Sequence, residues 1–188
     1  MKLERWPVRA ELGDGPSATG GEGVTGFAVP TAAGTFGVLA SPRGVVAVLF
    51  PGFGAAELER RLTERGFAPG AGGRMRALEA GIELRRYLSG EVTAMSTPID
   101  TRRHTPFRRD VYRALAKVPC GATVTYGELA RLAGHPDAAR AVGAAMRANP
   151  TPIFVPCHRV VPAGGGLGGW SGPEGWKARL LALEGAAI

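Results

Sequence analysis

A cysteine and a histidine, Cys157 and His158, stand side by side within an apolar stretch over residues 153–161. The thiolate is the nucleophilic form of cysteine, and only a few per cent of an ordinary thiol is ionised near neutral pH. An adjacent imidazole, a helix N-terminus or a cation raises that fraction. The pair therefore has the composition of an activated nucleophile. A free cysteine packed in a hydrophobic core is the alternative, because free Cys is among the most buried residue types.

The neighbours of the pair predict where it lies. β-Branched and aromatic residues surround it, so residues 153–161 read as a buried strand, with Pro156 restricting the backbone just before the thiol. A last helix is predicted over residues 174–184, with Trp176, Leu180 and Leu183 on its apolar face. It ends in a glutamate, Glu184, where the helix dipole disfavours an anion. That carboxylate needs a partner, and a histidine would suit it.

Three helices are expected in the C-terminal half upstream of the cysteine. Thr105 and Pro106 are typical of an N-cap and a first helical residue, and they start the first helix. Thr125 and Glu128 have the spacing of a capping box, which starts a second helix that stops at Gly134. A third helix follows over residues 137–148 and is ended by Asn149 and Pro150. The last two helices form a helix-turn-helix signature, although helical hairpins also serve packing alone.

The third of these helices combines small residues, including Ala141 and Gly143, with Arg140 and Arg147. The two arginines are seven residues apart, about two turns, and so share one helix face. Tight helix–helix packing would explain the alanines and the glycine. A core helix rarely carries two arginines, so the face suits close approach to a phosphate-lined groove.

Charge is unevenly distributed along the chain. Residues 1–101 have no net charge, whereas residues 102–188 hold 12 Lys and Arg against 5 Asp and Glu, a net charge of +7. Nine of those 12 cations fall between Arg102 and Arg147. A polyanion such as nucleic acid is the partner that this pattern indicates, with a solvated basic surface as the alternative.

Composition restricts the remaining possibilities. With 188 residues, 45% of them hydrophobic, the chain can form one domain or two small ones. It has no apolar run long enough to span a bilayer and no apolar leader, so we expect a cytoplasmic protein without membrane contact. The two cysteines, Cys120 and Cys157, are expected to be free thiols, with Cys120 serving packing. No cofactor or metal is expected, since residues 1–101 contain neither Cys nor His.

The N-terminal half predicts a small α/β unit. A glycine-rich, poorly ordered lead-in is expected over residues 1–23, then strands over 24–29, 34–40 and 45–50. Helices follow over 55–65 and 73–89, the second directing Met75, Leu78, Ile82 and Tyr87 toward a core. We expect an N-terminal domain over residues 1–94, a linker over 95–104 and a C-terminal domain over 105–188.

Several motifs in this order resemble one family, the O6-alkylguanine-DNA alkyltransferases. The resemblance is close over residues 84–185. Its motifs are Thr125-Tyr126-Gly127-Glu128-Leu129-Ala130, Ala139-Arg140-Ala141-Val142-Gly143, Asn149-Pro150, Pro156-Cys157-His158-Arg159-Val160 and Leu183-Glu184-Gly185. It implies an α+β fold, with a ribonuclease-H-like α/β domain followed by a helical winged-helix or helix-turn-helix-like domain. It also implies DNA repair by direct damage reversal, in which an alkyl group moves irreversibly from O6 of guanine to the protein's own cysteine.

The resemblance also assigns catalytic roles. Cys157 would accept the alkyl group, His158 would deprotonate it through a water, and Glu184 would orient the imidazole. Tyr126 would donate a proton toward guanine N3. Asn149 would brace the turn before the cysteine.

For DNA, the resemblance implies binding in the minor groove by a monomer, with the lesion flipped out of the stack. Arg140 would fill the gap left by the flipped nucleotide, and the small-residue helix with Ala141, Gly143 and Arg147 would lie against the groove. Ser171 and backbone groups near Val160 would contact the base. Trp170 stands where the family commonly has tyrosine, which predicts a bulkier pocket wall.

Three other functions fit parts of the sequence. A non-catalytic sensor of alkylated bases would share the fold, but such relatives carry tryptophan at the position of Cys157. A helix-turn-helix regulator would bind a specific sequence and would be indifferent to the loss of Cys157. A cysteine hydrolase would turn over repeatedly.

Overall fold

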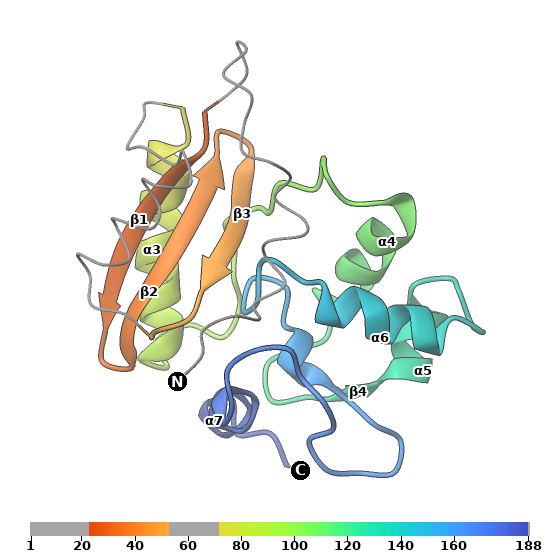
Figure 1. Ribbon diagram of the computed structural model, residues 1–188. Helices are drawn as coiled ribbons and strands as arrows, with labels where there is room; N and C mark the ends of the chain where they lie inside the picture. Colours follow the sequence, from red (N-terminus) through yellow and green to blue (C-terminus); the bar gives the residue numbers. More distant parts are fainter. Residues whose placement is uncertain (1–22, 53–71, 188) are drawn as a thin grey trace. The chain divides into compact units, whose positions relative to one another are not determined.

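The computed structural model describes residues 23–52 and 72–187, which contain both sheets and helices and confirm a mixed α/β composition (Figure 1). The predicted helix over residues 55–65 lies outside the described residues, as does the predicted lead-in except for Gly23. Two compact units meet in sequence between Asp100 and Thr101. No helix in the described ranges has the length and hydropathy needed to cross a membrane.

An antiparallel three-stranded sheet forms the first unit, in the order β1-β2-β3. Its strands are β1 (Thr25–Thr31), β2 (Gly34–Ser41) and β3 (Gly44–Leu49). All three predicted strands are confirmed with shifts of one or two residues. The hairpins turn at Gly34 and Gly44, whose φ values of +109° and +155° favour glycine. Helix α3 (Arg74–Leu88) runs along the sheet in Figure 1 and packs mainly on β1 and β2.

The predicted core face of α3 is wrong except for Tyr87, which is buried. The other three predicted side chains are exposed, Met75 by 67%, Leu78 by 38% and Ile82 by 61%. The buried face consists of Ala77, Ala80, Gly81, Leu84 and Tyr87. A Cβ atom at Gly81 would lie 3.1 Å from Cγ2 of Val29, so helix and sheet approach too closely there for large side chains. Close packing near Gly81 thus favours a face with small residues there and with Leu84 and Tyr87 in the following turn.

The segment after α3 extends the edge of the sheet. The amide of Val45 donates to the Pro98 carbonyl and that of Asp100 to the Val45 carbonyl, both at 2.8 Å, which pairs Ile99 in parallel with β3. Asp100 also accepts a hydrogen bond from Ser41 Oγ at 2.7 Å. These contacts attach the end of the first unit to its sheet.

Helices dominate the second unit, and a two-stranded parallel sheet pairs β4 with β5. The elements are α4 (Pro106–Leu115), β4 (Val124–Thr125), α5 (Tyr126–Leu132), α6 (Ala139–Arg147), the 3₁₀ turn η1 (Cys157–Arg159), β5 (Val160–Val161) and α7 (Trp176–Leu183). Helices α4, α5 and α6 pack together, and the buried Tyr112 hydroxyl donates to the Ala145 carbonyl at 3.0 Å.

The predicted starts of α4 and α5 are confirmed, whereas α6 begins at Ala139, two residues after the predicted start of its helix. Thr105 Oγ1 accepts from the Arg108 amide at 3.3 Å, and Pro106 is the first helical residue of α4. At α5, Thr125 Oγ1 accepts from the Glu128 amide at 3.2 Å while Glu128 accepts from the Thr125 amide at 2.8 Å. This reciprocal pair is a capping box.

The prediction of a continuous buried strand over residues 153–161 is wrong. All residues from 153 to 160 are buried, but only Val160 and Val161 pair as a strand, and Cys157 begins the 3₁₀ turn η1. Pro152 and Pro156 lack amide donors and interrupt a ladder. The Arg159 amide donates instead to the Pro156 carbonyl at 2.9 Å, which closes the turn around the cysteine.

The last helix is also shorter than predicted and buries a different residue. Leu180 is buried as expected, but Leu183 is 40% exposed and Leu181 takes its place in the core. Glu184 is the C-cap of α7.

Candidate active site

The backbone before the cysteine is shaped by one buried amide side chain. Asn149 donates from Nδ2 to the Val155 carbonyl at 2.9 Å and accepts from the Thr151 amide at 3.0 Å. Between these contacts, Ile153 has a φ of +76°, a strained value for a β-branched residue. The Cys157 amide then donates to the Val155 carbonyl at 2.7 Å. The loop is therefore held in one conformation that presents the thiol from a turn.

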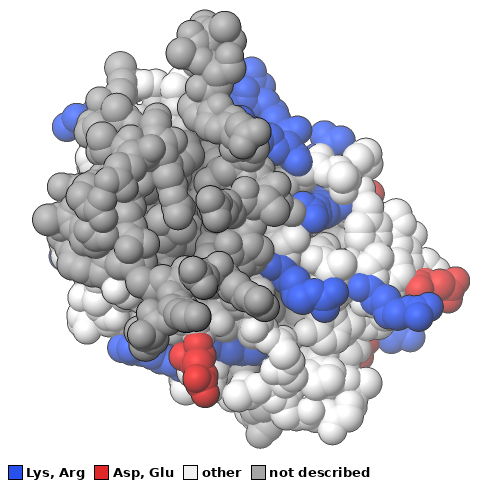
Figure 2. Space-filling view, in the orientation of Figure 1, with Lys and Arg blue, Asp and Glu red and all other residues white. Residues whose placement is uncertain are grey.

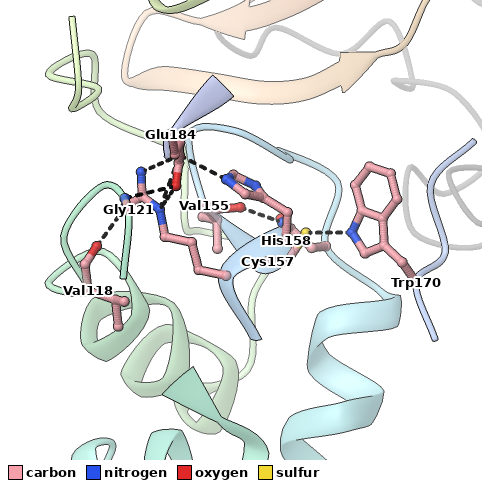
Figure 3. A network of polar contacts seen from close by, with 9 residues as sticks. Val118, Gly121, Val155, Cys157, His158, Trp170 and Glu184 are labelled. Atoms are coloured by element: carbon pink, nitrogen blue, oxygen red, sulfur yellow. Dashed lines mark hydrogen bonds and ion pairs between the residues drawn. The ribbon is translucent and has the colours of Figure 1, made fainter. Parts of the chain in front are cut away.

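Cys157 is buried, with 4% of its surface exposed. The indole Nε1–H of Trp170 donates to its Sγ atom at 3.3 Å (Figure 3). Burial raises the pKa of the thiol, while hydrogen bonds from Trp170 and Asn149 and the charge of Lys177 act in the opposite direction. The resting thiol is thus protonated, and its ionisation needs a base.

His158 and Glu184 are in contact, as predicted from the position of Glu184 at the end of the last helix. Nε2 of His158 lies 3.0 Å from Oε1 of Glu184, and both side chains are almost fully buried (Figure 3). Burial lowers the pKa of His158, although the Glu184 carboxylate opposes that shift. The imidazole is therefore neutral near pH 7 and able to accept a proton.

Arg159 is a member of this network that the sequence analysis missed. Its Nη2 and Nε donate to the Glu184 carboxylate at 2.7 and 2.9 Å, and its Nη1 donates to the Val118 carbonyl at 2.6 Å. The Gly121 amide also approaches Oε2 of Glu184, at 3.4 Å. An arginine inside an otherwise apolar stretch was the available signal, because a buried cation requires a buried anion.

Lys177 was also missed. It lies in α7, is buried, and donates from Nζ to the Val160 carbonyl at 2.6 Å. Burial lowers its pKa, while the nearby Cys157 acts to raise it. Its position three residues before the core residue Leu180 was the sequence signal. The backbone near Val160 was predicted to contact the substrate, and the Val160 carbonyl already accepts a hydrogen bond from Lys177.

Tyr126 connects helix α5 to the glycine-rich loop over residues 162–172. It is the first residue of α5, and its hydroxyl donates to the Gly169 carbonyl at 3.5 Å. Burial is the main cause that raises the pKa of Tyr126, followed by the proximity of Cys157. The phenol is protonated near neutral pH and can act as a proton donor. A Cβ atom at Gly143 would lie 3.9 Å from its ring, so Gly143 on α6 lies close to Tyr126.

Helix α6 exposes the face that the sequence analysis expected. Arg140, Ala141, Ala144 and Arg147 are exposed and Gly143 is half-buried. The opposite face, with Val142, Ala145 and Met146, is buried. Figure 2 shows Lys and Arg side chains over the part of the view that carries α4 and α6 in Figure 1, with few acidic ones among them.

Two further predicted residues lie on the loop before α7. Trp170 and Ser171 are both half-buried, and of the two Trp170 contacts the thiol. Cys120 is half-buried, and burial and the nearby Glu184 raise its pKa. Among the described residues, no three His, Cys, Asp or Glu side chains gather as a metal site would need.

The arrangement joins a buried thiol, a neutral imidazole anchored by a carboxylate, and a protonated phenol. Such a set activates a nucleophile and protonates a leaving group. The exposed arginines lie on α6, and Gly143 of the same helix lies close to the Tyr126 ring.

Known proteins share this part of the chain. The family model described as "6-O-methylguanine DNA methyltransferase, DNA binding domain" matches residues 106–186. The methylated-DNA–protein-cysteine methyltransferase of Shigella flexneri is 44% identical over 103 residues, which cover 55% of this chain and 60% of that protein. The first such relatives are thus matched over about 60% of their length.

Two other relatives are matched over more of their length. The methylated-DNA–protein-cysteine methyltransferase of Methanosarcina acetivorans is 43% identical over 108 residues, which cover 57% of this chain and 69% of that protein. The crystal structure of Mycobacterium tuberculosis OGT in complex with DNA superposes with a TM-score of 0.66 at 32% identity, covering 86% of this chain and 92% of the other. On this identity and coverage, the chain belongs to the methylated-DNA–protein-cysteine methyltransferase family.

Proposed function

We propose that this protein repairs DNA by moving an alkyl group from O6 of guanine to Cys157, once per molecule. The hydrogen bond between His158 and Glu184, with Cys157 directly before His158 in the 3₁₀ turn, carries the proposal, because these residues can supply a nucleophile, a base and the group that orients the base. Membership in the family supports the reaction class. The related M. tuberculosis protein bound to DNA supports the partner.

Removal of the thiol proton is the first step. Glu184 holds Nε2 of His158, so Nδ1 is the nitrogen that accepts the proton, directly or through a water. The imidazolium that forms is stabilised by the Glu184 carboxylate. Arg159 keeps that carboxylate ionised, because its guanidinium donates to both carboxylate oxygens.

Alkyl transfer follows as an in-line displacement. A bond forms between Sγ of Cys157 and the alkyl carbon as the bond from that carbon to O6 breaks, and its electron pair passes to the guanine. Tyr126 donates a proton to the departing base and recovers one from the imidazolium. The products are guanine and an S-alkylcysteine thioether. A thioether lies outside thiol–disulfide exchange, so each molecule reacts once.

The lesion reaches the thiol only after it leaves the base stack, at a cost of a few kcal/mol. The exposed face of α6 lies in the minor groove, where Ala141 and Gly143 permit close approach. Arg140 enters the stack in place of the flipped nucleotide, and Arg147 binds phosphate. Minor-groove contacts discriminate poorly between sequences, as a repair protein requires.

Within the pocket, Ser171 and the backbone near Val160 contact the flipped guanine, and Asn149 keeps the preceding turn in place. Trp170 forms the wall beside the thiol.

We also propose the finer architecture and setting. Residues 1–94 form a ribonuclease-H-like domain, residues 95–104 are a linker whose Ile99 pairs with the edge of the sheet, and residues 105–188 form a winged-helix-like domain with the DNA surface and the thiol. The protein acts as a cytoplasmic monomer. The three-stranded antiparallel sheet with α3 and the helices α4 to α6 support this division.

The test is an intact-mass measurement after incubation with a duplex that contains one O6-methylguanine. We expect a single added methylene mass, stoichiometric with protein and mapped to Cys157. Cys157→Ala should gain no mass, and the matched variant Cys120→Ala should gain it in full. Tight lesion binding without a mass change would favour the non-catalytic sensor. Repeated turnover would overturn the single-use reaction.

A further inference from the structure

The indole of Trp170 contacts the reacting atom itself. Its Nε1–H donates to Sγ of Cys157 at 3.3 Å, and the two residues are 13 positions apart (Figure 3). The residue stands in the glycine-rich loop over residues 162–172, and its substitution for the family's tyrosine predicted only a bulkier pocket wall. A buried sulfur with a polar donor aimed at it differs from a sulfur in an apolar wall, because the donor favours the anion.

The loop places the indole through a glycine. A Cβ atom at Gly172 would overlap the six-membered ring of Trp170, so the indole lies directly against the backbone there. Any other residue at position 172 would displace the ring. The same loop is in contact with the site a second time, where the Gly169 carbonyl accepts from the Tyr126 hydroxyl at 3.5 Å. The donor is thus oriented by packing rather than free to rotate.

We propose that Trp170 is a catalytic hydrogen-bond donor to the Cys157 thiolate and that Gly172 is the residue that positions it. This inference rests on the proposed alkyl transfer. When His158 removes the thiol proton, the N–H of Trp170 stabilises the negative charge on sulfur. When the S–C bond forms, that charge disappears and the hydrogen bond weakens, because a thioether is a weak acceptor.

The role has a distinctive kinetic signature. A charge-assisted hydrogen bond of ordinary strength changes the thiolate population about tenfold. A thiolate that loses such a donor is rarer near neutral pH but intrinsically more nucleophilic, with a Brønsted coefficient of about 0.4–0.5. The net loss of rate near pH 7 is therefore about threefold. At high pH, where every thiol is ionised, the loss should vanish or reverse.

The test compares Trp170→Phe, which keeps a ring and removes the N–H, with its parent in a Cys120→Ala background. Thiolate absorbance and the rate of alkylation by iodoacetamide are both followed against pH. We expect the titration to move to higher pH, so that the thiolate fraction near pH 7 falls about tenfold. The two rate profiles should cross at high pH. Trp176→Phe removes an indole that stacks on Arg179 and should leave both curves unchanged.

Gly172→Ala is the second variant, since it retains the indole N–H but displaces it from the sulfur. It should shift the titration in the same direction as Trp170→Phe. An unchanged titration in both variants would overturn the proposal, and so would a rate altered by one factor at every pH, which indicates a steric wall. Neither readout uses DNA. A parent that titrates as expected but takes no alkyl group from O6-methylguanine would refute the proposed function alone.

Discussion

Nε2 of His158 lies 3.0 Å from Oε1 of Glu184, although the two residues come from the 3₁₀ turn and from the end of the last helix. Both side chains are shielded from solvent. The contact uses Nε2, one of the two titratable ring nitrogens of His158. Protonation of this imidazole is therefore linked to the stability of the fold as well as to chemistry.

The first prediction concerns acid stability. Burial lowers the pKa of His158, so below the ordinary histidine value of 6.5 the unfolded chain binds a proton more readily than the folded one. The contribution of neutral His158 is complete above that pH and is lost as the pH falls. The free energy of unfolding in urea should be measured from about pH 8 to about pH 5. It should fall more steeply with decreasing pH than in His158→Gln, and the difference in slope should correspond to the uptake of up to one proton. Parallel declines would contradict the assignment.

The second prediction concerns the carboxylate. Glu184→Gln keeps the shape of the side chain but leaves the Arg159 guanidinium buried without an anion. The free energy of unfolding should fall by about 3 kcal/mol, as for other broken buried ion pairs. Chemical denaturation would measure the loss, and Glu174→Gln, at an exposed position, is the matched control. A loss as small as in that control would show that the pair is not coupled.

The third prediction concerns the turn before the thiol. Asn149→Ala removes the donor to the Val155 carbonyl and the acceptor of the Thr151 amide, both buried. We expect a loss of about 2 kcal/mol in the free energy of unfolding. Alkylation of Cys157 by iodoacetamide should also change from one exponential phase to several, because the loop is no longer held in one conformation. Asn149→Asp keeps the acceptor and should lose less. Full stability in Asn149→Ala would argue against the bracing role.

The fourth prediction separates the chemistry from DNA binding. Arg140→Ala should slow repair of O6-methylguanine in a duplex at least about tenfold, because the gap left by the flipped base stays empty. Reaction with free O6-benzylguanine should be unchanged. Arg131→Ala removes an exposed arginine from α5 and serves as the control. Equal losses with both substrates would contradict the proposal that Arg140 fills the gap left by the flipped nucleotide.

Local signals predicted well where a short-range rule decides the structure. Thr105 and the Thr125–Glu128 capping box were readable because each cap depends on residues three positions apart. The contact of Glu184 was predictable because an anion at a helix C-terminus needs a partner, and His158 provides one.

Long-range packing decided what the sequence could not predict. Hydrophobicity favoured Met75 and Ile82 as the core of α3, but the close approach at Gly81 admits only small side chains. Arg159 and Lys177 would be expected at the surface, and only the folded chain shows the acceptors that make their burial tolerable.

The short distance between Trp170 and Cys157 has a last consequence, for the protein after it has reacted. A methyl group on Sγ needs volume in a place that is already 96% closed to solvent and flanked by the indole. The thioether also offers the N–H little to bind. Alkylation should therefore displace the indole from the sulfur and change its fluorescence. Intrinsic tryptophan fluorescence would then measure the fraction of alkylated protein directly, without labelled DNA.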